Sequence, residues 1–396
     1  MPSSIQILQP ACGLSSDAIQ TVTTLNIDLS AGFQANVAPI PVDDCTGGVY
    51  YLRSKTRRIA AVFKPSDEEP YAPNNPKQYV HHHPQKSKLD FKVVSHPEDR
   101  SESSLSISGV GSSGIGIRAG IAAGDAAVRE VVAFLLDKNQ AAGVPITVLA
   151  RASHPAFHYA ASLPSSRQQE RKSKTGALQA YVPHKCTADD LSSSLFSVAD
   201  VHTVALLDIR LANQDRHGGN ILVVEPSKRV FKLVPIDHGA CLPRIADIEE
   251  TSFLWLSWPQ AKRPFSEDML QYIVSLDPFE EIRMLQQALP QTHQLEEQAL
   301  LTLLICTVFL QVCTLEKNMS AYDIGMLMCR HGSFCQQQPA LSTLELLVAK
   351  TLDDCAAGSS CRRLRGSQLD PEQYFKAVVQ SFRDHLATFL STWKQQ

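Results

Sequence analysis

No two of the ten cysteines in this 396-residue sequence form a C-x-x-C pair. Cys329 and Cys335 repeat the spacing of Cys355 and Cys361, but no histidine cluster accompanies them, so a zinc site is not predicted. A disulfide framework is not expected in a chain of this length. We therefore expect a reducing compartment, in which most cysteines are small core residues.

The sequence also has no large excess of either charge, because 37 Lys and Arg residues accompany 40 Asp and Glu residues, for a net charge of −3. Global charge therefore gives no reason to expect nucleic-acid binding, and an anionic ligand must meet a local basic patch. The first residues lack a basic segment followed by an apolar run, so no signal peptide is expected. We expect a cytoplasmic protein, with any membrane attachment peripheral.

Long apolar runs are almost absent. The one that is present extends from Ala299 to Leu315 and is interrupted by Thr302, Thr307 and Gln311. A helix that spans a bilayer needs about 17–25 residues, so this run is at the short limit. The interruptions favour a buried helix of a large lobe.

The length of the chain suggests two lobes. The first half has several β-prone segments and one amphipathic helix over 125–138, and helices dominate the later part, so we predict an α+β protein. We expect an N-terminal extension over 1–39, a β-rich lobe over 40–185 that contains a flexible insertion over 78–113, and a mainly helical lobe over 186–396.

A lysine ends an apolar strand in the first lobe. Ile59 to Phe63 is a short apolar run that predicts a buried strand, and Lys64 follows it at once. Together with the β-prone residues after Gly47 and Gly48, the run indicates a hairpin with glycines at its tip. Glu130, on the amphipathic helix, is a candidate partner for Lys64.

Four polar side chains of different kinds share the loop from Asp215 to Asn220. Asp215 or His217 is suited to take a proton from an acceptor hydroxyl, and Arg216 lies between them. Asn220 offers a neutral oxygen to magnesium, five positions after Asp215. The alternative is a polar turn, and this loop alone does not exclude it.

A second carboxylate, Asp237, follows the apolar strand Val234–Ile236 and precedes Gly239. Phosphoryl transfer needs a lysine for the ATP phosphates, a carboxylate for the acceptor hydroxyl and oxygen ligands for the metal. The ordered set of strand lysine, helix glutamate, D-R-H-x-x-N loop and strand-D-x-G therefore indicates a kinase.

These motifs identify a family. The chain resembles the phosphatidylinositol 3-/4-kinase superfamily, and most closely the type II branch with the plant gamma-type phosphatidylinositol 4-kinases, over about 38–330. The segments that carry the resemblance are Val62–Pro76, Ala127–Asp137, Leu207–His217, Ile236–Pro243 and Trp255–Ala261.

The resemblance implies a bilobal kinase fold that uses ATP and Mg²⁺, with Mn²⁺ as the second choice of metal. It also implies a role for each candidate residue. Thr46, Gly47, Gly48, Val49, Lys64 and Glu130 belong to the phosphate end of the ATP site, Gln179, Ala180, Tyr181 and Val182 to the hinge at the adenine, Asp215, Arg216 and His217 to catalysis, and Asn220 and Asp237 to the metal.

The implied reaction moves the γ-phosphate of ATP to the 4-hydroxyl of phosphatidylinositol at a membrane surface, and we expect a monomer. Two alternatives stay open, a Ser/Thr protein kinase of the gamma-type family with a protein acceptor, and a catalytically silent ATP-binding scaffold. Intact Lys64, Asp215, Asn220 and Asp237 argue against the scaffold, whereas sequence does not separate the two acceptors.

The segment from Arg244 to Pro264 is expected to face the acceptor. Lys262 and Arg263 are suited to an inositol phosphate, and Trp255 and Trp258 to a membrane interface. Burial of both tryptophans in the helical lobe is an equal alternative.

Overall fold

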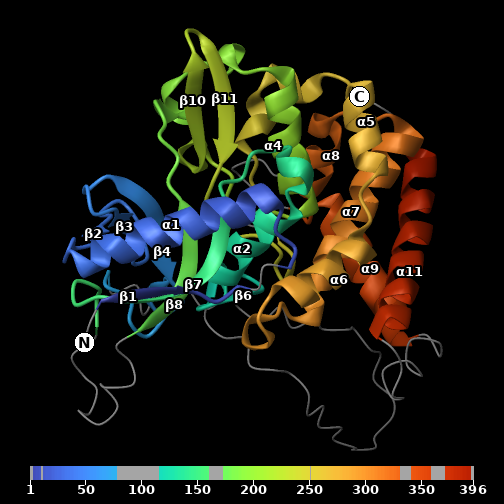
Figure 1. Ribbon diagram of the computed structural model, residues 1–396. Coiled ribbons are helices and arrows are strands. Elements are labelled where there is room, and N and C mark those ends of the chain that lie inside the picture. The colour runs from blue at the N-terminus through green and yellow to red at the C-terminus, as the bar shows by residue number, and fades with distance from the viewer. Residues whose placement is uncertain are drawn as a thin grey trace, which may run out of the picture.

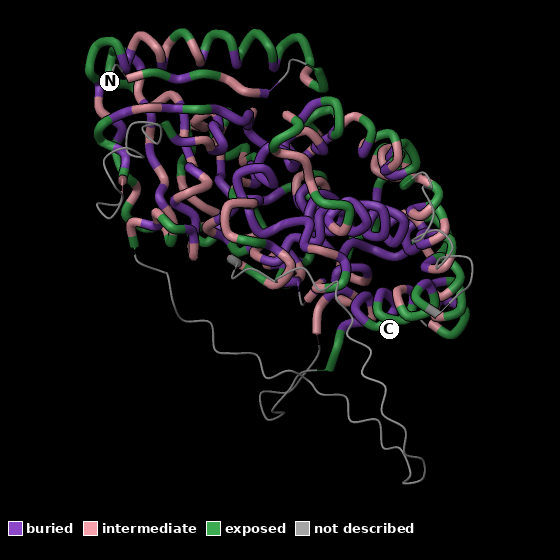
Figure 2. Tube along the Cα trace, turned by 90° about the horizontal axis from the view of Figure 1, so that it is seen from below, coloured by how far each residue is buried: buried purple, intermediate pink, exposed green. Residues whose placement is uncertain are grey.

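The computed structural model describes residues 3–9, 12–77, 116–159, 173–249, 251–330, 340–357 and 371–393. The chain forms a sheet-rich lobe and a mainly helical lobe, each with a buried interior (Figures 1 and 2). This α+β bilobal arrangement confirms the fold class predicted from the sequence. The insertion expected over 78–113 lies outside the described residues.

The sheet-rich lobe is built on a six-stranded antiparallel sheet. Side-chain alternation directs Phe63 and Leu178 toward α1 (Ser16–Gln34) on one face. The neighbouring Ala177 packs with α2 (Ala126–Leu136) on the other face, the side to which Lys64 also points. The strands in sheet order are β1 (Ser4–Ile7), β7 (Thr147–Ser153), β8 (Lys174–Ala180), β4 (Ile59–Pro65), β3 (Tyr50–Arg53) and β2 (Ile40–Pro41).

The N-terminal residues are part of this lobe, and not the extension expected over 1–39. Strand β1 pairs with β7 at the edge of the sheet, and α1 begins after the capping residue Ser15. Leu29 and Phe33 of α1 are fully buried against the sheet. The weak sequence pattern has a physical cause: β1 is a four-residue edge strand, and α1 buries only one narrow stripe.

The helical lobe starts with the three-stranded sheet β11-β10-β9, formed by Val230–Pro235, Ile221–Ser227 and Cys186–Thr187. Helices then surround a common core. They are α4 (Val198–Arg210), α5 (Glu267–Val274), α6 (Pro278–Ala288), α7 (Glu297–Lys317), α8 (Ala321–Met328), α9 (Thr343–Ala357) and α11 (Pro371–Thr392).

Helix α7 is the centre of the helical lobe. Among the described helices, it alone is long and apolar enough to cross a bilayer, yet 83% of its most apolar stretch is buried inside the protein. The prediction of a buried core helix over 299–315 is therefore confirmed.

The two tryptophans of the segment after β11 are also buried. Trp255 has an exposed fraction of 0%, and its Nε1 donates a hydrogen bond to Asp208. Trp258 packs against Phe196. The membrane-interface interpretation of these residues is wrong, because both side chains fill the core of the helical lobe.

Candidate active site

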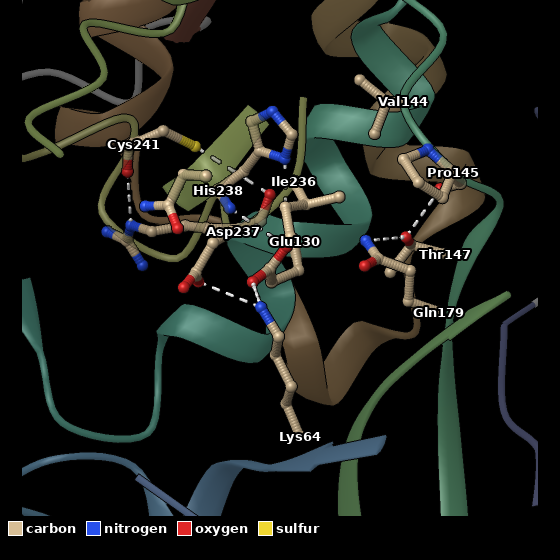
Figure 3. A network of polar contacts seen from close by, with 12 residues as sticks. Lys64, Glu130, Val144, Pro145, Thr147, Gln179, Ile236, Asp237, His238 and Cys241 are labelled. Carbon is tan, nitrogen blue, oxygen red and sulfur yellow. Dashed lines mark hydrogen bonds and ion pairs between the residues drawn. The ribbon is translucent and has the colours of Figure 1, made fainter. Parts of the chain in front are cut away.

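Three side chains from separate elements converge between the lobes. Lys64 from β4 forms an ion pair with Glu130 of α2, and its Nζ lies 3.0 Å from Asp237 Oδ1 after β11 (Figure 3). Glu130 is buried, and its other oxygen accepts a hydrogen bond from the His238 backbone N–H at 3.1 Å. The lysine, glutamate and second carboxylate of the sequence prediction are therefore brought together.

These charges support one another. Burial by itself lowers the pKa of Lys64, but Asp237 and Glu130 outweigh burial and raise that pKa above its usual value. The positive charge of Lys64 in turn lowers the pKa of Asp237 well below its usual range. At neutral pH the site therefore holds a lysine cation and an aspartate anion.

The backbone at Asp237 is unusual. Its φ of 57° is in the left-handed region, which Asp and Asn adopt more readily than other non-glycine residues. Two residues later, a Cβ on Gly239 would lie 2.9 Å from the Cβ of Ala126, so this segment fits against α2 only with glycine there. The turn leaves the Asp237 side chain 53% exposed, where a ligand can reach it.

The sequence had suggested a catalytic role for Arg216. In the structure this side chain instead has a supporting role behind the loop. It is almost fully buried, and its Nε lies 3.0 Å from both carboxylate oxygens of Asp208. Its Nη1 donates to the carbonyls of Asn220 at 2.6 Å and Ile236 at 2.8 Å. Arg216 therefore holds the loop that carries Asn220 beside the strand end that leads to Asp237.

Asp208 is a site residue that the sequence reasoning missed. It is completely buried on α4 and also accepts hydrogen bonds from Asn213 Nδ2 at 2.9 Å and Trp255 Nε1 at 3.0 Å. A carboxylate inside the apolar run Leu206–Ile209 was the signal that could have found it, because a buried charge needs partners.

Asp215 and His217 both remain accessible beside this framework. The Asp215 backbone N–H donates to Asn213 Oδ1 at 3.1 Å, and its carboxylate contacts Arg118, which the sequence reasoning did not assign. His217 is exposed. Asn220 Nδ2 donates to the Asp215 carbonyl at 3.0 Å, so the amide oxygen is left for a ligand.

The residues expected to bind the metal fit a hard cation. A half-exposed carboxylate on Asp237 and an amide oxygen on Asn220 are oxygen ligands, which Mg²⁺ prefers. The described part of the chain contains no group of three or more His, Cys, Asp or Glu arranged around a metal. Two protein ligands suit Mg²⁺, which also keeps waters and nucleotide phosphates as ligands.

The glycine pair is not at the tip of the hairpin that leads to Lys64. Gly47 and Gly48 lie between β2 and β3, while residues 54–58 connect β3 to β4. The Gly48 N–H donates to the Glu68 carbonyl at 2.9 Å, and a Cβ on Gly48 would collide with the Glu68 carboxylate. Asn75 Nδ2 also donates to the Thr46 carbonyl at 3.0 Å. The loop is thus held on the segment after Lys64, and the role of Thr46–Val49 over ATP phosphates stays a prediction.

The predicted hinge begins inside the sheet. Gln179 is buried and donates to Thr147 Oγ1 at 3.0 Å (Figure 3). The N–H groups of Ala180 and Tyr181 donate to the carbonyls of Ile146 and Ala60 at 2.8 and 3.0 Å. These two donors are used by the sheet, so an adenine contact is better expected from Val182 onward, where the chain leaves β8.

The sheet-rich lobe contributes a lysine paired with a glutamate, and the helical lobe contributes two loop carboxylates. This arrangement defines a kinase. The chain belongs to the phosphatidylinositol 3- and 4-kinase family, whose model matches residues 46–307. The family resemblance predicted from the sequence is confirmed.

Curated plant proteins give the closer comparison. The chain is 36% identical over 335 residues to phosphatidylinositol 4-kinase gamma 6 of Arabidopsis thaliana, which covers 82% of this chain and 48% of that protein. It is 35% identical over 346 residues to phosphatidylinositol 4-kinase gamma 7 of the same plant, and this alignment covers 85% of this chain and 47% of that protein. It is 33% identical over 343 residues to phosphatidylinositol 4-kinase gamma 4 of Oryza sativa subsp. japonica, with 83% of this chain and 51% of that protein covered. The chain spans about half the length of these relatives.

Proposed function

We propose that this protein is a phosphatidylinositol 4-kinase, which transfers the γ-phosphate of ATP to the inositol 4-hydroxyl. The observation that carries the kinase assignment is the convergence of Lys64, Glu130 and Asp237 from two lobes. The choice of lipid is supported by the family match and by the names of the relatives, which are all phosphatidylinositol 4-kinases.

Each polar residue then has one task. Lys64, kept charged by its two carboxylates, binds nucleotide phosphates, and Glu130 fixes its direction. Asp237 and Asn220 would hold Mg²⁺, which would supply positive charge close to the nucleotide phosphates. Asp215 accepts the hydrogen bond of the acceptor hydroxyl and orients its oxygen toward the phosphorus.

The acceptor side is the segment after β11. Lys262 and Arg263 are exposed, so both cations are accessible to an anionic headgroup. Because the tryptophans of this segment are buried, we propose that membrane contact is electrostatic and peripheral. We also propose a cytoplasmic monomer.

The test offers Mg-ATP with phosphatidylinositol vesicles and, separately, with a generic protein acceptor, and measures labelled product on each. Asp237→Asn should lose most of the transfer to both acceptors, and Asp384→Asn, which changes an exposed residue of α11, should behave as the wild type. Phosphate on the lipid supports the proposal. Phosphate on protein alone would replace it with the protein-kinase function, and ATP binding without transfer would favour a scaffold.

A further inference from the structure

A short hairpin places an arginine at the edge of the transfer site. The hairpin consists of β5 (Gly116–Arg118) and β6 (Ile121–Ala122), which precede α2. Arg118 Nη2 lies 2.6 Å from Asp215 Oδ1, although the two residues are 97 positions apart in the chain. The guanidinium therefore contacts an oxygen of the carboxylate that is proposed to accept the hydrogen bond of the acceptor hydroxyl.

The backbone of this hairpin is held by both lobes. The Gly120 carbonyl accepts a hydrogen bond from the Arg244 N–H at 3.0 Å, and a Cβ on Gly120 would lie 2.8 Å from that nitrogen. Ile121 is buried, and the Gly124 N–H after the hairpin donates to Glu69 Oε2 at 2.7 Å. These contacts hold the hairpin backbone against both lobes, whereas the long side chain of Arg118 is half exposed and can change partners without moving the backbone.

The ion pair itself is exposed. The side chains of Arg118 and Asp215 are 48% and 40% exposed, and an exposed pair of this kind contributes little to stability. The neighbouring Arg216–Asp208 pair is fully buried and permanent by comparison. Arg118 can therefore leave Asp215 at small cost, whereas Arg216 cannot leave Asp208.

A phosphate is the partner that suits Arg118 after this exchange. Arg118 contacts one oxygen of Asp215, Oδ1, so an acceptor hydroxyl that binds this oxygen would compete with the guanidinium. A guanidinium released in this way would remain next to the hydroxyl that is proposed to receive the phosphoryl group. The planar fork of an arginine matches two phosphate oxygens at once, and the pairing is stronger than that with an exposed carboxylate.

We infer that Arg118 is a phosphate-binding residue of the transfer site, which exchanges Asp215 for a substrate phosphate when substrate binds. The inference rests on the proposed phosphotransfer. Two phosphates share this chemistry, the γ-phosphate of ATP and the phosphodiester of the lipid, and the experiment separates them.

The first arm needs no acceptor. The full chain, as wild type, Arg118→Gln and Arg118→Lys, is titrated with Mg-ATP and with Mg-ADP. The control is Arg283→Gln, which removes another exposed arginine whose Nη2 lies 2.7 Å from a carboxylate, Glu280. If Arg118 binds the γ-phosphate, Arg118→Gln lowers the affinity for ATP about ten- to a hundredfold and changes the affinity for ADP little. Arg118→Lys recovers only part of this loss, because lysine lacks the planar guanidinium that contacts two phosphate oxygens.

The second arm measures steady-state transfer to phosphatidylinositol vesicles. If Arg118 binds the phosphodiester, KM for the lipid rises by the same factor in Arg118→Gln while ATP affinity is unchanged. A selective loss in either arm supports the inference. Unchanged values in both arms overturn it, as does faster turnover, which would mean that Arg118 only blocks Asp215. If the wild type phosphorylates no lipid, the lipid proposal fails separately, and unchanged ATP affinity then overturns the inference about Arg118.

Discussion

The two lobes hold their reacting side chains in different ways. In the helical lobe, the buried carboxylate of Asp208 binds Arg216 and Trp255 behind the loop, and Asp215 faces outward from it. In the sheet-rich lobe, Lys64 is fixed by charged groups that belong to the site itself, Glu130 and Asp237. In the helical lobe, the residues that hold the loop are therefore different from the residue that faces the substrate. Between the lobes, the residues that hold Lys64 in place are themselves part of the reacting site.

The largest effect should come from breaking the framework of the helical lobe. Asp208→Ala leaves the guanidinium of Arg216 buried without its counter-charge, so the free energy of unfolding should fall by about 3–5 kcal/mol. Urea denaturation measures the loss. Asp384→Asn, on the exposed face of α11, is the control and should change stability little. A loss below about 1 kcal/mol in Asp208→Ala would contradict the assignment of Asp208 as the structural centre of the loop.

Asp237→Asn tests a residue that should affect activity much more than stability. Turnover should fall about a hundred- to a thousandfold, because a metal ligand loses its charge. Stability should change by less than about 1 kcal/mol, because the side chain is half exposed and Asn tolerates the left-handed backbone. Kinetics and thermal unfolding of one preparation measure both. Equal losses of activity and stability would show that Asp237 acts as a structural residue.

A smaller effect should follow from crowding the glycine loop. A methyl group on Gly48 collides with the buried carboxylate of Glu68, so Gly48→Ala should cost about 1–3 kcal/mol and raise KM for ATP. Gly47→Ala is the matched control, since its Cβ would meet no atom closer than 3.1 Å. The two variants should differ in thermal midpoint, and identical midpoints would refute the close contact.

The smallest effect concerns pH. Burial raises the pKa of the Glu69 carboxyl to about 7, although it accepts hydrogen bonds from the N–H groups of Gly124, Ala126 and Ala127. The folded protein keeps a proton there that the unfolded chain loses above its ordinary pKa of 4.5, so the stabilisation is present below pH 4.5 and is lost as pH rises through 7.

The free energy of unfolding should therefore fall by about 1–2 kcal/mol more between pH 5 and 7 in the wild type than in Glu69→Gln. Denaturation at several pH values measures the difference, and parallel pH profiles for the two proteins would exclude a role for Glu69.

The sequence predicted the parts of the site that lie where a recognisable element ends. Lys64 ends an apolar strand, Asp237 follows another, and Glu130 lies on an amphipathic helix, so each residue had a local pattern to mark it. Asp208 and Arg118 had no such pattern. Their importance depends on partners that are distant in the chain, and single-sequence periodicity carries no information about such contacts.

Wrong predictions also have local causes. The N-terminal residues were separated from the lobe because β1 is short and becomes a strand only through its pairing with β7. A membrane-interface role for Trp255 stayed an alternative because composition does not reveal that the Trp255 Nε1–H donates to buried Asp208. Arg216 was grouped with catalysis because it lies between two polar loop residues, whereas the loop directs alternate side chains inward and outward.

Helix α2 is held at three points within its first five residues. Glu69 binds its first turn, the Arg129 Nε donates to the Cys241 carbonyl at 3.0 Å, and Glu130 bridges Lys64 and the His238 N–H. Kinases are commonly switched off by displacement of the corresponding helix, which separates the lysine from its glutamate. Here such a swing would have to rupture all three attachments together, so control of this enzyme is better sought in the delivery of its substrates than in an outward rotation of α2.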